Sequence, residues 1–171
     1  MKKFQKLPSE FFVLDVLKVA PELLGKILVC RVGEEFLRYR ITETEAYRGT
    51  EDLACHASKG RTTRTEAMYH KGGVLYVYLI YGMYWMLNVV TGLEDEPQAV
   101  LIRGLESIHG PGRLTKKLQI DKSYYGENVT LSTRIWFESD GFKPAYQTGK
   151  RIGIDYAEEW KNKQWRYYVV F

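Results

Sequence analysis

"GGVLYVYLIYGMYWMLNVV", residues 72–90, contains two runs of β-forming residues that are joined at the tripeptide 81–83. Aliphatic and aromatic residues favour strands, and a short glycine-containing connection between two such runs favours a β-hairpin. Alternation gives the first strand an aliphatic face (Leu75, Val77, Leu79) and an opposite face (Val74, Tyr76, Tyr78, Ile80). We expect the aliphatic face to pack on the core together with Tyr84 and Trp85, so that Tyr76 and Tyr78 face a cleft or solvent.

Two residues of this stretch do not suit a plain hydrophobic hairpin. Tyr81 falls on the turn, where a large aromatic ring has little to bury against. Asn88 lies in the apolar end of the second run, where its amide needs hydrogen-bond partners. The turn position predicts that Tyr81 inserts into another molecule.

The segments around the hairpin predict further strands and a few short helices. We expect a short helix capped by Ser9, a helical segment that is interrupted at Pro21 and ends near Gly25, and strands over 26–32, 37–47 and 98–106. Residues 110–120 predict a Gly/Pro loop that leads into a short helix, and 151–171 a helical turn followed by an aromatic strand. The predicted fold class is α+β, with a curved, mostly antiparallel sheet, a protruding β-hairpin and peripheral helices.

Length and composition are typical of one soluble globular domain. The chain has 171 residues, of which 45% are hydrophobic and 27% charged, and neither a repeat nor a linker divides it, so we expect a single domain over 1–171. Cys30 and Cys55 give no disulfide framework, which favours a reducing compartment. Charged residues interrupt the amino-terminal apolar residues, and no stretch approaches a membrane span. These features predict a cytoplasmic protein without a membrane partner.

The charge of the chain permits a polyanionic partner without requiring one. The formal net charge is +4, and cations gather in the segments 59–71 and 112–122. Either cluster is compatible with nucleic-acid binding or with a solvated surface.

The strand 37–47 carries the first candidate for catalysis. Alternation places Ile41, Glu43, Glu45 and Tyr47 on one face, next to a long polar loop. A carboxylate in such a place is a candidate general base. The alternative is a solvated face on which Glu43 or Glu45 pairs with a cation.

Arg103 lies in the middle of the apolar run 99–105, where a cation needs a partner. The two glutamates of the strand 37–47 are available, and an arginine beside a carboxylate keeps it ionised and can fix a water. The alternative is a purely structural pair with Glu106 or an aspartate.

The polar loop suggests a metal site at first sight, because Glu51, Asp52, Cys55 and His56 lie close together in it. No second Cys/His pair follows at ligand spacing, so we predict no metal site. His56 is either a ligand contact or a structurally hydrogen-bonded side chain. No nucleophilic triad, phosphate-binding loop or dinucleotide fingerprint is present.

Taken in order, "ITETEAYRGTEDLACHASKGRTTRTEAMY", "GGVLYVYLIYGMYWMLNVVTG", "AVLIRGLE", "GPGRLTKKLQID" and "RIGIDYAEEW" closely resemble the alkyladenine (3-methyladenine) DNA glycosylase family, from about residue 9 to the end. The resemblance implies a monofunctional enzyme without a cofactor that flips damaged purines out of double-stranded DNA and cuts their N-glycosidic bond. We expect it to act as a monomer.

The resemblance also implies a role for each matching residue. Glu45 is the expected general base, and Arg103 helps to hold the attacking water. Tyr47 and Tyr78 are the walls between which the flipped base stacks, and His56, supported by Tyr76, touches its edge. Tyr81 is the wedge that fills the gap in the duplex, and Asn88 clashes with the exocyclic amine of guanine. Glu43 is expected to pair with a cation.

Two other functions remain open from the sequence. One is a non-catalytic nucleic-acid-binding module with the same fold. The other is a sugar glycosidase that uses Glu43 and Glu45, because same-face strand neighbours lie roughly 6.5–7 Å apart and an inverting pair needs about 6.5–9.5 Å. Binding of a neutral sugar would give the cation clusters no function.

Overall fold

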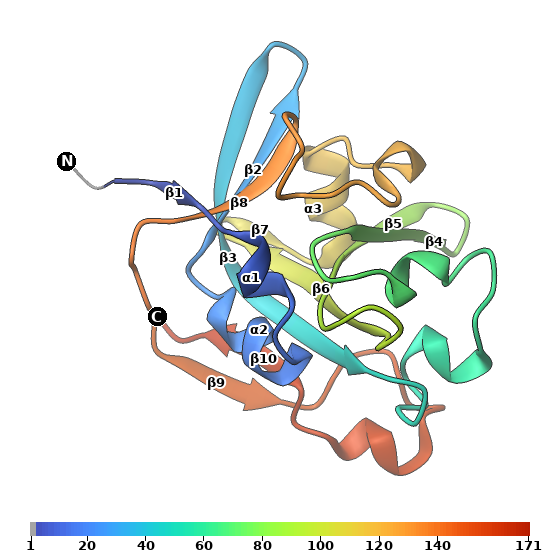
Figure 1. Cartoon of the computed structure of the whole chain (residues 1–171). Helices are drawn as coiled ribbons and strands as arrows, with labels where there is room; N and C mark the ends of the chain where they lie inside the picture. Colours follow the sequence, from blue (N-terminus) through green and yellow to red (C-terminus); the bar gives the residue numbers. More distant parts are fainter. Residues whose placement is uncertain (1–2) are drawn as a thin grey trace.

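One long strand, β3 (Glu35–Arg48), organises the molecule. The computed structural model describes residues 3–171, and within them ten strands form one sheet (Figure 1). The strands are β1 (Gln5–Lys6), β2 (Ile27–Val32), β3, β4 (Leu75–Ile80), β5 (Tyr84–Val90), β6 (Gln98–Leu105), β7 (Ile108–His109), β8 (Ile135–Ser139), β9 (Tyr146–Gly149) and β10 (Arg166–Val169). The α-helices and 3-10 helices lie around this sheet, so the α+β prediction is confirmed.

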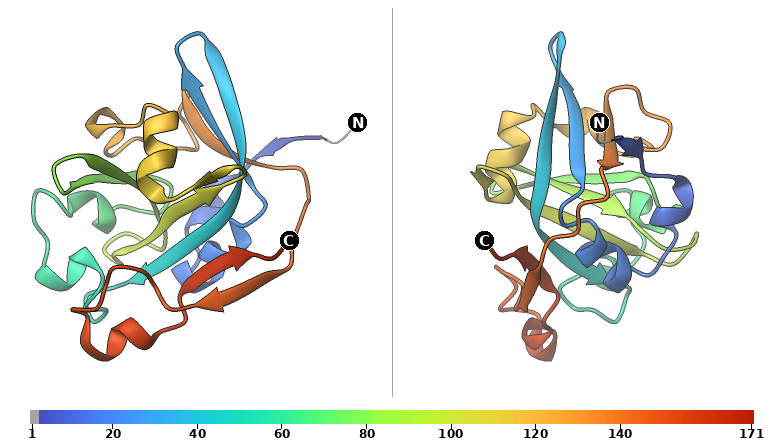
Figure 2. Two further views of the ribbon diagram at one scale, coloured as in Figure 1. Left: turned by 180° about the vertical axis from the view of Figure 1, so that it is seen from behind. Right: turned by 90° about the vertical axis from the view of Figure 1, so that its left-hand side faces the viewer.

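The sheet is antiparallel throughout its described pairings and runs in the order β1-β8-β2-β3-β6-β5-β4. The first half of β3 pairs with β2, and that hairpin stands out from the rest of the molecule (Figure 2). The second half of β3 pairs with β6 on one side and with β10 on the other. The carboxylate-bearing part of β3 therefore lies between two strands from distant parts of the chain.

Two short helices precede β2. The first, α1 (Ser9–Phe12), has Pro8 at its N-cap, so the expected capping by Ser9 is wrong. Proline fixes a φ angle that suits a helix start, and Ser9 becomes the first helical residue. The second, α2 (Val16–Glu22), is capped by the side chain of Asp15, and Pro21 lies inside its last turn rather than ending it.

The β4–β5 hairpin reaches outward between α3 (Pro111–Lys117) on one side and the 3-10 helices η1 (His56–Lys59) and η2 (Glu66–Tyr69) on the other (Figures 1 and 2). Leu75 and Val77 enter the main core, as predicted, while Tyr76 and Tyr78 belong to a second cluster on the opposite face. The register pairs Tyr76 with Asn88 and Ile80 with Tyr84.

The outer part of the hairpin is more exposed than predicted. Leu79 is 38% and Tyr84 45% exposed, so neither is a core residue. The main core therefore ends before the tip of the hairpin. A Cβ atom at Gly112 would lie 2.8 Å from Cδ1 of Tyr84, so glycine allows α3 to approach this ring closely.

The carboxyl-terminal part contains elements that the sequence does not predict and two that it does. β8 pairs with β2 and β1, and β9 forms an edge beside β10. The predicted helical turn and aromatic strand are η4 (Glu158–Asn162) and β10. The short 3-10 helix η3 (Lys122–Tyr124) follows α3. None of the helices among residues 3–171 has the length and apolar character needed to cross a membrane.

Candidate active site

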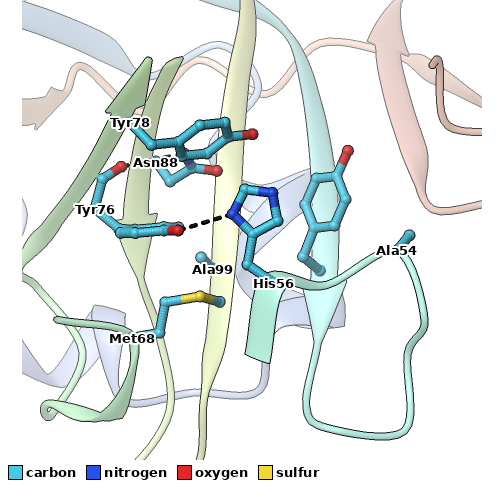
Figure 3. Close-up of a pocket in the computed structure, with 8 residues that line it drawn as sticks. Ala54, His56, Met68, Tyr76, Tyr78, Asn88 and Ala99 are labelled. Atoms are coloured by element: carbon cyan, nitrogen blue, oxygen red, sulfur yellow. Dashed lines mark hydrogen bonds between the residues drawn. The ribbon is translucent and has the colours of Figure 1, made fainter. Parts of the chain in front are cut away.

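A cavity of about 380 Å³ opens between β3, the β4–β5 hairpin and the segment 152–156. Tyr47 and Tyr78 both line it, together with Arg103 and the hairpin residue Tyr81. Beside it lies a small recess that shares Tyr47, Tyr78 and His56 and has room for about one water, with a volume of about 20 Å³ (Figure 3). The fold thus brings together aromatic side chains from β3 and from the hairpin.

Glu45 is fully buried behind the wall of this cavity. The Tyr47 hydroxyl donates to Oε2 of Glu45 over 2.6 Å, and the Ile152 N–H donates to Oε1 over 2.8 Å. Nε of Arg103 lies 3.5 Å from Oε1. All three residues line the cavity, so the carboxylate is separated from it by its two hydrogen-bond donors and its ion-pair partner. Burial raises the pKa of Glu45, and the charge of Arg103 opposes this rise.

Arg103 joins the two glutamates of β3, which confirms the predicted pairing. Its Nε donates to Oε1 of Glu43 over 3.1 Å, and Glu43 also accepts from Arg166 over 3.3 Å. Glu43 is therefore paired with cations, as expected. A register irregularity between Ile41 and Glu43 places Ile41 in the main core, so the predicted shared face begins at Glu43.

Tyr47 and Tyr78, which line the cavity, each have a guanidinium group near the ring. The guanidinium of Arg151 lies 4.9 Å from the ring centre of Tyr47, and that of Arg64 lies 5.3 Å from the ring centre of Tyr78. Burial raises the pKa of both tyrosines, which keeps their hydroxyls protonated. Cation–π contacts thus hold both rings in place.

His56 lies against the hairpin (Figure 3). Its Nδ1 is 2.8 Å from the Tyr76 hydroxyl, and its ring centre is 4.5 Å from that of Tyr78. Burial, with smaller contributions from Arg64 and Lys59, lowers the pKa of His56 to about 4. The ring is therefore neutral at physiological pH. The predicted contact between Tyr76 and His56 is confirmed, whereas contact with a base stays a prediction.

Asn88 is buried and lines the small recess. Its Nδ2 donates to the main-chain oxygen of Tyr76 over 3.1 Å and lies 3.5 Å from that of Met86. These bonds hold the amide in place, and Met68 and Ala99 narrow the remaining space.

Tyr81 sits at the tip of the hairpin and is 87% exposed. Its φ of 51° lies in the left-handed region, which a bulky residue rarely adopts. Gly82 follows with a φ of 64°. The turn thus presents an aromatic ring to solvent with backbone strain, a combination that often marks a functional position.

The structure adds three residues that sequence reasoning missed as part of this site. Arg151 and Asp52 form a buried ion pair next to Tyr47, and Ile152 supplies the N–H to Glu45. Arg151 begins the apolar segment 151–154. A cation next to apolar residues needs a partner, and the same argument identified Arg103. The sequence indicates Asp52 only as a possible metal ligand. Within residues 3–171, no three His, Cys, Asp or Glu side chains are placed to hold a metal ion together.

The predicted cation clusters lie on both sides of the hairpin. In the first, Arg61 is tied to Glu66 and Asp95, whereas Arg64 rests on Tyr78. In the second, Arg113, Lys116 and Lys117 are exposed on α3. Either cluster can face a polyanion that crosses the hairpin tip.

Comparison with known proteins gives a consistent result. A family model described as methylpurine-DNA glycosylase matches residues 10–170. A protein of Natranaerobius thermophilus is 42% identical over 96% of this chain and 95% of its own length. A protein of Legionella pneumophila (strain Corby) is 45% identical over 96% and 94%, and one of Psychrobacter cryohalolentis is 43% identical over 92% and 88%. The names of all three contain the words 3-methyladenine DNA glycosylase.

Proposed function

We propose that this chain, which belongs to the methylpurine-DNA glycosylase family, rotates alkylated or deaminated purines out of duplex DNA and hydrolyses their N-glycosidic bond. As a family member it is a DNA glycosylase, which decides against a non-catalytic binding module and a sugar glycosidase. 3-Methyladenine is the expected substrate, and 7-methylguanine, hypoxanthine and ethenoadenine are further candidates. All 171 residues serve as one domain, which acts as a monomer without a cofactor.

The observation that carries this proposal is the environment of Glu45. A fully buried carboxylate receives hydrogen bonds from Tyr47 and Ile152 and lies beside Arg103, directly behind a cavity with two aromatic walls. A buried carboxylate with specific charged and hydrogen-bonding partners at a cavity is typical of a catalytic group.

The aromatic walls offset the cost of flipping. Removing a damaged base from the duplex costs a few kcal/mol, and stacking contributes about 1–3 kcal/mol per base. Tyr47 and Tyr78 supply two such surfaces, and the cavity of about 380 Å³ lies between the elements that carry them. The neutral His56 offers a ring nitrogen to the edge of the base.

In the proposed reaction Glu45 acts as the general base. A water from the cavity reaches the carboxylate between Tyr47, Ile152 and Arg103, loses a proton to a Glu45 oxygen and forms a bond from its oxygen to C1′ of the sugar. The C1′–N bond breaks, and its electron pair stays with the purine. A cationic alkylated purine leaves as a neutral base and needs no acid. Arg103 favours the ionised form of Glu45 before the reaction.

Asn88 provides the expected discrimination against normal guanine. Its amide is fixed by main-chain oxygens, and the recess in front of it has a volume of only about 20 Å³. Guanine carries an exocyclic 2-amine that 3-methyladenine, hypoxanthine and ethenoadenine lack; 7-methylguanine keeps this amine and is therefore expected to be excised more slowly than those three. That extra group meets a side chain that cannot turn away without giving up buried hydrogen bonds.

Tyr81→Ser is expected to weaken the flipped state with little effect on folding. The side chain is 87% exposed, so its loss removes no core packing, but it leaves the gap in the duplex unfilled. We expect the flipping equilibrium to fall about tenfold, as measured with a base analogue that fluoresces when unstacked. An equal flipping signal in the two proteins would show that Tyr81 is not the wedge. The melting temperature serves as the folding control.

Release of free base from a lesion-containing duplex tests the proposed function. The purified protein is incubated with methylated DNA and with duplexes that carry one hypoxanthine or ethenoadenine, and the released bases are separated by chromatography. The proposal expects 3-methyladenine to be released with abasic sites in equal number.

A further inference from the structure

The buried ion pair between Asp52 and Arg151 joins three parts of the chain behind the active site. Both side chains are completely buried. Nη1 of Arg151 donates to Oδ2 of Asp52 over 2.6 Å, and Nη2 donates to Oδ1 over 2.9 Å. Nη1 also donates to the main-chain oxygen of Ala46 in β3, and Nη2 to that of Trp160 in η4. The polar loop, β3 and the carboxyl-terminal segment thus meet at one guanidinium.

Each carboxylate oxygen of Asp52 accepts two hydrogen bonds. Besides Arg151, its two oxygens accept from the N–H groups of Arg48 and Ala54. The ion pair therefore fixes the start of the loop that carries His56, as well as the segment that follows Arg151. A pair with this many bonds has no freedom to re-form elsewhere if one partner is changed.

Both hydrogen-bond donors of Glu45 depend on the position of Arg151. The next residue in the chain, Ile152, gives its N–H to Oε1 of Glu45 over 2.8 Å. Tyr47, whose hydroxyl donates to Oε2, lies against the guanidinium with 4.9 Å between Cζ and its ring centre. Trp165 covers the guanidinium from another side at 5.0 Å. Ile152 itself is 50% exposed, so packing of its own side chain does not hold it there.

We propose that the Asp52–Arg151 ion pair is a positioning device for the catalytic carboxylate, which holds the Ile152 N–H and the Tyr47 hydroxyl on the two oxygens of Glu45. The inference rests on the proposed role of Glu45 as general base. The pair touches neither DNA nor the reacting atoms in this account. It acts by fixing the carboxylate's direction and by favouring its ionised form.

Weakening the Asp52–Arg151 ion pair is expected to raise the pKa of Glu45. Four charged or titratable groups among residues 3–171 face Glu45. They are Arg103 on β6, Arg151 just after β9, Tyr47 on β3 and Tyr78 on β4. Glu43 contacts Arg103, and Arg166 contacts Glu43, so these two groups influence Glu45 only indirectly. Hydrogen bonds from Ile152 and Tyr47 lower the pKa of Glu45 against the effect of burial. Their loss raises this pKa, so the acid limb of the activity profile moves to higher pH.

Asp52→Asn tests the proposal, with Asp140→Asn as the matched control. Asp140 forms a two-bond pair with Arg40, at 3.2 Å and 2.9 Å, outside the active site. Both changes keep side-chain shape and remove one charge from an Arg–Asp pair, so both lower the melting temperature. Arg151→Lys is a second variant in case Asp52→Asn folds poorly. Lysine keeps the positive charge but cannot form the two parallel hydrogen bonds of the guanidinium group to Asp52. Single-turnover release of 3-methyladenine is measured against pH on the folded fraction, together with affinity for a duplex containing a tetrahydrofuran abasic analogue.

We expect Asp52→Asn and Arg151→Lys to move the acid limb upward by about one pH unit and to slow excision about tenfold at neutral pH, with unchanged affinity for the analogue duplex. Asp140→Asn should leave the acid limb in place. Loss of melting temperature with an unmoved acid limb, or a change in DNA affinity alone, would overturn the proposal. Full activity of Glu45→Gln would instead remove the base assignment on which it rests, so the two failures are distinguishable.

Discussion

Glu45→Gln is expected to lower single-turnover excision of 3-methyladenine by about 10³-fold, while binding of lesion-containing duplex stays within a few-fold of the wild type. The amide has the shape of the carboxylate but cannot accept the proton of the attacking water, and general-base catalysis typically contributes about 10²–10⁴-fold. Glu45 is fully buried, so the change leaves the exposed hairpin tip unaltered. Single-turnover kinetics and a gel-shift titration measure the two effects.

Glu43→Gln is the matched control, because Glu43 lies two residues away and shares Arg103 with Glu45. We expect less than a tenfold loss of excision from it. The wild type should also lose activity as the pH falls through the raised pKa of Glu45, because protonation removes the base. Equal losses in the two glutamine variants, or excision by Glu45→Gln at the wild-type rate, would contradict the assignment.

Arg103→Gln is expected to have the second-largest effect, and it acts on both stability and catalysis. The guanidinium is only 14% exposed and neutralises two carboxylates, one of them completely buried. Removal of one partner of a buried pair costs about 3 kcal/mol of folding free energy. Excision at neutral pH should fall by about 10²-fold, since an electrostatic partner of the reacting group is lost. Urea denaturation and single-turnover kinetics provide the two measurements.

A double variant separates the two effects of Arg103. In Arg103→Gln/Glu45→Gln the buried negative charge is gone, so much of the lost stability should return while excision remains absent. Glu43 keeps Arg166 as its partner in both variants. If the double variant were less stable than Arg103→Gln alone, Glu45 would not be the carboxylate that needs this cation.

Local rules were sufficient for much of the sheet and for the central ion pair. Alternation in residues 72–90 predicts which hairpin residues face the core, and Leu75 and Val77 do so. Arg103 is conspicuous because a cation inside an apolar strand needs a carboxylate, and the structure supplies Glu43 and Glu45. These predictions succeed because each depends on a strong physical cost that few arrangements can avoid.

Other features depend on long-range contacts that no local sequence pattern indicates. Asp52 and Arg151 are 99 residues apart. Arg151 follows β9, which reaches this part of the molecule by pairing with β10, the neighbour of β3. The strands β8 and β9 are short and carry mixed residues, so they are defined by their neighbours. The exposure of Leu79 and Tyr84 reflects where the core ends, which alternation alone does not indicate.

The central claim is that the chain excises damaged purines, and the wild-type protein tests it most directly. Methylated duplex DNA is incubated with the protein and, in parallel, with Glu45→Gln, and free bases are quantified along with abasic sites. The account predicts release of 3-methyladenine by the wild type only, above the spontaneous rate, with one abasic site per base and no release of normal guanine. DNA binding without any free base, or equal release by the two proteins, would contradict it.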